Sequence, residues 1–127
     1  MAPPRLTLRV DFDGRRSVGP GKIRLLEAVA STGSISSAGR SLGMSYRRAW
    51  MLIDDLNTSF REKLVTTTLG GKEGGGAVLT PFGAEVLKRY RAIEAGAAKA
   101  AKTHLAFLAR AAKADKTETA KRTKLSR

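Results

Sequence analysis

Cysteine is absent from the chain, and histidine occurs only once, at position 104. Without cysteine this sequence offers no disulfide, no thiolate zinc site and no cysteine nucleophile. His104 cannot build a metal site alone, and on a helix rich in alanine and lysine we expect it to be solvated or at an interface. We therefore predict no metal ion, no cofactor and no catalytic residues.

Acidic residues are also scarce, since the chain has 11 of them and 24 lysines and arginines. The formal net charge is +13 over 127 residues. The only adjacent carboxylate pair is Asp54-Asp55, and neighbours on a helix point apart, so an enzyme is not expected. With 42% hydrophobic residues the chain can bury a core, which leaves the basic excess for a surface or a tail. Nucleic acid is the commonest partner of such a surface.

Long apolar runs are missing too. No segment approaches the length of a membrane span, and no amphipathic helix sets bulky anchors opposite its lysines. The N-terminus, from Met1 to Arg5, lacks the apolar core of a signal peptide. We therefore expect a cytoplasmic protein without a membrane partner.

Residues 6–12 alternate apolar and polar side chains, which predicts a half-buried strand. Residues 20–32 carry apolar side chains at helical spacing, with Gly19-Pro20 as a start and Gly33 as a stop. The predicted apolar stripe of this first helix is Ile23, Leu26, Val29 and Ala30.

A short helix, a glycine turn and a longer helix follow. Ser34 can cap the short helix and Gly43 ends it, whereas Ser45 caps a third helix that runs to about Asn57. We expect one stripe of the third helix to face inward, at Ala49, Trp50, Ile53 and Leu56. Arg47, Arg48 and Met51 then face outward. The arrangement is typical of a helix-turn-helix, which presents the first turn of its second helix to DNA bases.

Residues 64–69 and 77–79 read as two strands around a glycine-dense segment, 70–76. A hairpin directly after a reading helix is typical of the wing of a winged helix. Lys72 lies at its tip, where glycines let a lysine follow a phosphate backbone. An ordinary mobile loop is the alternative.

Thr80-Pro81 starts a fourth helix, whose apolar stripe continues to about residue 112. Such a helix is roughly 45 Å long, more than a domain of this size can cover, so a two-fold dimer along it is the economical solution. A partly frayed helix is the alternative. The predicted dimerisation residues are Val86, Tyr90, Ile93, Ala97 and Phe107.

These elements predict a mainly α protein with a small β wing. We expect residues 1–80 to form a winged helix-turn-helix DNA-binding domain, 81–112 the long dimerisation helix, and 113–127 a disordered basic tail that adds nonspecific DNA affinity.

Four segments of the sequence resemble the N-terminal domain of the molybdate-responsive regulator family ModE. They are TGSIS at 32–36, GMSYRRAW at 43–50, GGK at 70–72 and GGGAVLT at 74–80. The resemblance implies a winged helix related to the LysR-type domain. It also implies a homodimer formed through the last helix, and a palindromic operator near genes of molybdenum uptake or molybdenum enzymes.

Carried over residue by residue, the resemblance places Ser34 and Ser36 near the DNA backbone and Lys72 in the wing. The reading helix would present Ser45, Tyr46, Arg47 and Arg48, whereas Ala49 and Trp50 are expected to be structural.

The sequence departs from the family in two places. Full-length members carry C-terminal domains that bind molybdate, whereas this chain ends in a lysine-rich segment, so we do not expect it to bind molybdate directly. In the first wing strand, Thr66 and Thr67 replace an acidic residue and an arginine, and Glu73 is added at the tip.

The leading hypothesis is a sequence-specific, dimeric transcription regulator that binds double-stranded DNA in the nucleoid. The alternative is an architectural protein that coats DNA with little sequence preference.

Overall fold

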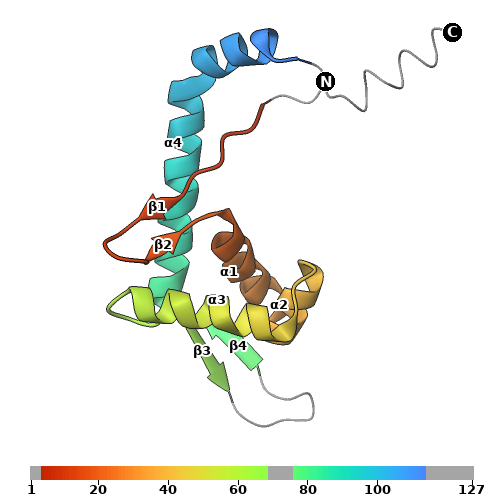
Figure 1. The fold of residues 1–127 in the computed structure, drawn as a ribbon. Coiled ribbons are helices and arrows are strands. Elements are labelled where there is room, and N and C mark those ends of the chain that lie inside the picture. The colour runs from red at the N-terminus through yellow and green to blue at the C-terminus, as the bar shows by residue number, and fades with distance from the viewer. Residues whose placement is uncertain (1–3, 69–75, 114–127) are drawn as a thin grey trace, which may run out of the picture. The chain divides into compact units, whose positions relative to one another are not determined.

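A computed structural model describes residues 4–68 and 76–113 of the chain. These residues belong to two compact units, one spanning Thr7–Gly96 and the other formed by the described parts of Met1–Leu6 and Ala97–Arg127. Along the chain, a first strand pair precedes three helices, and a second strand pair separates these from a long fourth helix (Figure 1).

The helices are α1 (Pro20–Thr32), α2 (Ile35–Ser41), α3 (Tyr46–Ser59) and α4 (Pro81–Ala111). The strands are β1 (Val10–Asp11), β2 (Ser17–Val18), β3 (Val65–Thr68) and β4 (Gly76–Leu79). This confirms the predicted winged helix-turn-helix with a small β wing and a long last helix. The helix starts coincide with the predicted ones because Pro20 and the three caps Ser34, Ser45 and Thr80 act locally.

The strand predicted over residues 6–12 is much shorter in the structure. Only Val10 and Asp11 pair, with Val18 and Ser17 of β2, in an antiparallel register. Since β2 leads at once into α1, the alternating segment has no partner backbone for its other residues. The length of β1 is therefore set by how much of β2 is available for pairing. The alternation of apolar and polar residues in the sequence carries no information about that partner.

Helix α1 occupies the centre of the larger unit, in contact with α2, α3 and β4. Its fully buried side chains are Ile23, Leu25, Leu26 and Val29. The predicted stripe omitted Leu25 and included Ala30, which is exposed. A helix contacted by three elements buries a wider arc than one stripe, so α1 is a core helix and not a surface one.

Asn57, in the last turn of α3, fixes the start of the wing. Its Oδ1 accepts hydrogen bonds from the backbone N–H groups of Leu64 (2.9 Å) and Val65 (3.1 Å), and its Nδ2 donates to the Val65 carbonyl (3.0 Å). At the other strand, Ala77 N–H donates to the Gly33 carbonyl at 2.8 Å. The base of the β3–β4 hairpin is thus held both to α3 and to the turn after α1.

The start of α4 packs directly on the chain before β3. Thr80 Oγ1 accepts from Gly83 N–H at 2.9 Å and donates to the Lys63 carbonyl at 2.7 Å. A Cβ at Gly83 would lie 2.2 Å from the Leu64 carbonyl oxygen, so only glycine fits here. The close approach holds α4 against the wing base.

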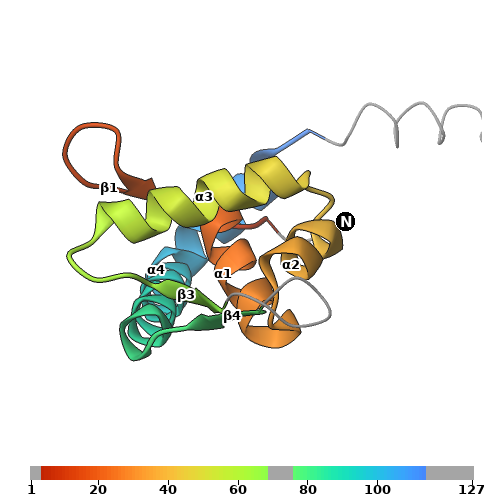
Figure 2. The ribbon, with the colours of Figure 1, turned by 90° about the horizontal axis from the view of Figure 1, so that it is seen from below.

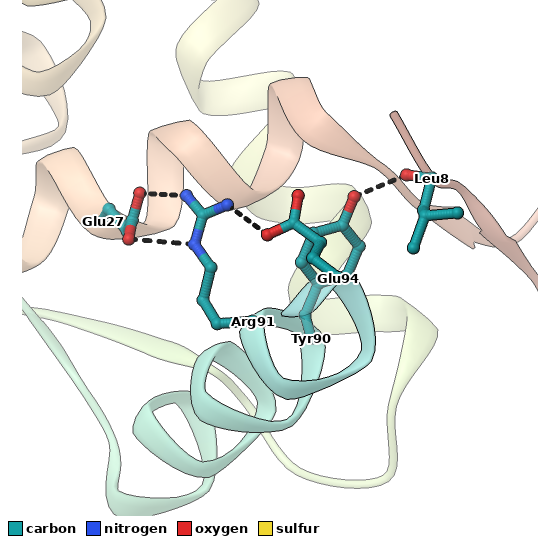
Figure 3. A network of polar contacts seen from close by, with 5 residues as sticks. All are labelled: Leu8, Glu27, Tyr90, Arg91 and Glu94. Atoms are coloured by element: carbon teal, nitrogen blue, oxygen red, sulfur yellow. Dashed lines mark hydrogen bonds and ion pairs between the residues drawn. The ribbon is translucent and has the colours of Figure 1, made fainter. Parts of the chain in front are cut away.

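A network of polar contacts joins α4 to the rest of the larger unit (Figure 3). The Arg91 guanidinium donates to both carboxylate oxygens of Glu27 on α1, and to Glu94 one turn further along α4. Tyr90 is buried and its hydroxyl donates to the Leu8 carbonyl. Burial raises the pKa of the Tyr90 hydroxyl above its usual value, and the hydrogen bonds with Glu27 and Glu94 raise that of Arg91.

Candidate nucleic-acid interface

The turn between α2 and α3 is defined by local side-chain caps. Ser34 Oγ accepts from the Ser37 N–H, and Ser45 Oγ accepts from the Arg48 N–H, each at 3.1 Å. Between the helices, Gly43 has φ +70°, a left-handed conformation that glycine adopts without strain. These contacts fix where α3 begins, and so which side chains occupy its first turn.

Helix α3 runs along one side of the larger unit and crosses in front of α1 in the view of Figure 2. Ala49, Ile53 and Leu56 are buried against the core. Tyr46, Arg47 and Arg48 are exposed, as a reading helix requires. The first turn therefore presents two guanidinium groups and a phenol outward.

Trp50 lies elsewhere than predicted. The sequence placed it on the inward stripe, but its side chain is 38% exposed, and its ring meets that of Tyr46 edge to face at a centroid distance of 6.2 Å. Consecutive residues of a helix lie about 100° apart around its axis. Because Ala49 faces the core, Trp50 lies at the edge of the buried face. The i, i+4 spacing of Tyr46 and Trp50 is the signal that could have paired them.

The two arginines of the first turn have different surroundings. Arg48 borders a hollow at the start of α1, which is lined by Arg9, Ser17, Gly19, Pro20, Gly21, Lys22, Met44, Arg48 and Leu52. Arg47 takes no part in this hollow. Among the described residues, neither guanidinium forms an ion pair, so both are available to an anionic partner.

A comparison with known protein families matches residues 21–84 to the bacterial regulatory helix-turn-helix proteins of the lysR family. The match begins in α1 and ends in the first turn of α4, so it contains the helix-turn-helix and both wing strands. This chain belongs to the LysR family of bacterial regulatory helix-turn-helix proteins.

Curated relatives of this LysR-family chain include molybdenum proteins. The molybdenum-pterin-binding protein MopB of Rhodobacter capsulatus is 48% identical over 82 residues, which are 65% of this chain and 30% of that protein. The molybdenum transport protein ModE of Azotobacter vinelandii is 39% identical over 87 residues, 68% of this chain and 32% of that protein.

The transcriptional regulator ModE of Yersinia pestis is 38% identical over 98 residues, 77% of this chain and 37% of that protein. This LysR-family chain thus spans about a third of the length of these relatives. The comparisons confirm the resemblance to the ModE DNA-binding domain.

The remaining predicted DNA contacts of the LysR-family domain belong to α2 and to the segment between the wing strands in the sequence. Ser34 is partly buried as the cap of α2, and Ser36 is exposed in the first turn of that helix. Lys72 lies outside the described residues, as does Glu73. The strands that carry their segment are described, and Thr66 and Thr67 are exposed on β3.

Two further properties concern the described part of the LysR-family chain, residues 4–68 and 76–113. No helix within it is both long enough and apolar enough to cross a membrane. It also contains no group of three or more histidine, aspartate or glutamate side chains placed to hold a metal ion.

Proposed function

We propose that this chain is a sequence-specific, DNA-binding transcription regulator that binds a palindromic operator as a homodimer. The observation that carries the proposal is the first turn of α3, where Arg47 and Tyr46 are exposed on a helix that Ser45 caps, within the segment matched to the LysR family. An arginine at this place of a helix-turn-helix can donate to guanine O6 and N7 in the major groove.

Contacts with the phosphate backbone would flank the reading helix. Ser34 and Ser36 lie at the start of α2, and Lys72 lies between the two wing strands in the sequence. Helix starts, hydroxyl groups and lysines all bind phosphate oxygens without reading bases. Such contacts fix the register of α3 on the duplex.

A homodimer formed through α4 is the second part of the proposal. Ile93 is 49% exposed and Phe107 is 63% exposed, which are large values for apolar side chains on a helix. Val86 and Ala97 are partly buried, whereas Tyr90 is buried within its own chain and lines the same hollow as Val86 and Ile93. A second copy of α4 would cover Ile93 and Phe107, and its two-fold axis would place two copies of α3 on a palindrome.

The proposal about the target genes rests on the names of the relatives. Because the relatives are named for molybdenum transport and molybdenum-pterin binding, we propose that the operator lies near genes of molybdenum uptake or use. The regulator would act in the cytoplasm, on the nucleoid. Recovery of bound DNA across the genome tests both statements, since it should return one two-fold symmetric motif upstream of such genes.

The decisive experiment is selection of bound duplexes from a random library, followed by affinity measurements at a stated salt concentration. A sequence-specific regulator should bind the selected duplex at least ~1,000-fold more tightly than random DNA. An architectural protein would bind both nearly equally, because phosphate contacts carry no sequence information. The family match favours the first outcome.

A further inference from the structure

We infer that an apolar patch on α3, made of Tyr46, Trp50 and Met51, contacts the methyl groups of thymines in the major groove. The inference rests on the proposed function, since it names what the reading helix recognises besides guanine. In this arrangement Trp50 and Met51 contact the thymine bases, and Tyr46 contributes to the contact through its aromatic ring.

The patch is conspicuous because of where it lies. The exposed fractions are 60% for Tyr46, 38% for Trp50 and 57% for Met51. Helices α1, α2 and α3 are described throughout, and among them these three side chains are the only large apolar ones that are exposed. Every other large apolar residue of the three helices is at least partly covered, and Tyr46 and Trp50 are in ring contact, so this cluster is a candidate contact surface.

DNA is the occupant that the surrounding charges favour. Arg47 lies within the patch in sequence and is exposed, and Arg48 follows it. Guanidinium groups beside an apolar surface suit the major groove, where phosphates surround base edges. The thymine C5-methyl is the apolar group that those edges present, and apolar side chains are its usual contacts.

The acidic residues further along α3 limit which part of the helix can approach DNA. Asp54 and Asp55 are exposed in the third turn, where phosphates would repel their carboxylates. Insertion by the N-terminal turns avoids this repulsion. Those turns are the ones that carry Tyr46, Trp50 and Met51.

The test uses the intact chain and the duplex that selection returns. Each thymine in the protected sequence is replaced singly by deoxyuridine, which removes only the methyl group and keeps the base pair. We expect a loss of about fourfold in affinity at one or more thymines, since a buried methyl contributes ~0.8 kcal/mol and tenfold is 1.4 kcal/mol. Deoxyuridine at a thymine outside the protected sequence is the control and should have no effect.

A Met51→Ala variant locates the contact on the protein. If Met51 covers a sensitive methyl group, the variant should bind thymine and deoxyuridine duplexes alike at that position, because the two changes remove the same contact. Trp50→Phe gives a second, independent comparison with a smaller ring. Both side chains are on the surface, and thermal unfolding of each variant verifies that it is folded.

The outcomes separate this inference from the proposed function. If selection returns no preferred sequence, the proposed function fails. If a sequence is selected but contains no thymine sensitive to methyl removal, the inference fails while the regulator stands. If Met51→Ala instead dissociates a dimer and leaves the thymine dependence intact, the patch binds a second copy of the chain and the inference is overturned.

Discussion

Helices α3 and α4 both leave apolar side chains uncovered, but their surroundings differ. On α3 the exposed apolar residues surround Arg47 in the first two turns. On α4 the exposed large apolar residues are Ile93, near the middle of the helix, and Phe107 and Leu108, near its end. The contrast fits the two partners that we propose, a DNA groove for α3 and a second copy of the chain for α4.

The largest expected effect comes from variants that disrupt the proposed dimer contact of α4. Ile93→Asp or Phe107→Asp would bury an unpaired charge in the proposed dimer, which costs about 3–5 kcal/mol. Either variant should dissociate the dimer, as measured by sedimentation or light scattering at micromolar concentration. Ala95→Asp, at an exposed position on the opposite face of the same helix, is the control and should stay dimeric. A folded wild-type monomer at this concentration would rule out the α4 dimer.

The second prediction tests how the first turns of α4 hold this helix against the rest of the larger unit. Gly83→Ala should lower the free energy of unfolding by about 2–3 kcal/mol, because the Leu64 carbonyl lies 2.2 Å from the new Cβ and the backbone must shift. Gly96→Ala is the matched variant, since beyond the neighbouring backbone of its own helix no heavy atom of the described residues lies within 4 Å of a Cβ placed there. It should raise stability by about 1 kcal/mol. Denaturant unfolding of both variants checks the pair, and stabilisation by both would contradict the packing at Gly83.

The contrast between Gly83 and Gly96 shows how much of the fold can be predicted from the sequence. Caps and turns act over a few residues, so Ser34, Gly43 and Ser45 predict the bounds of α2 and the start of α3. A glycine inside a helical pattern reads only as a weak point. That Gly83 is instead required by packing depends on Leu64, which lies far from it in the sequence.

The candidate site is predictable to a similar extent. The exposed first turn with Tyr46, Arg47 and Arg48 follows from the Ser45 cap and helical spacing. The exposure of Trp50 does not, because the width of the inward face depends on how α3 packs against α1. Likewise, Asn57 shows no sign in the sequence that it holds β3. Tertiary contacts determine both the exposure of Trp50 and the role of Asn57.

The third prediction separates base reading from phosphate binding on α3. Arg47→Ala should cost about 1–3 kcal/mol on the selected operator and relax the preference at one base pair, with less effect on random DNA. Arg48 lies beside the hollow at the start of α1, so we expect it to contact phosphate. Arg48→Ala, like Lys72→Ala, should weaken binding to both DNAs alike and reduce the salt dependence by roughly one unit. Equal losses on every sequence for Arg47→Ala would favour the architectural alternative.

The smallest expected effect concerns the contact that ties α4 to α1. Arg91 reaches Glu27 with two hydrogen bonds and is 40% exposed in its side chain. Because solvent screens a pair exposed to this degree, Arg91→Ala should lower the free energy of unfolding by only about 1 kcal/mol. Arg91→Lys keeps the charge but loses the bidentate geometry, and should recover part of this amount.

Arg89 supplies the matched control for this last prediction. It forms an ion pair with Glu85 on the same helix, at 2.8 Å and with its side chain 77% exposed. Arg89→Ala removes no link between helices, so it should cost no more than ~0.5 kcal/mol. Denaturant unfolding at low and high salt measures both variants. If Arg91→Ala costs no more than Arg89→Ala, the Glu27 contact does not hold α4 to α1, and apolar packing, including that of Phe82, Val86 and Tyr90, fixes the helix that would carry the second copy.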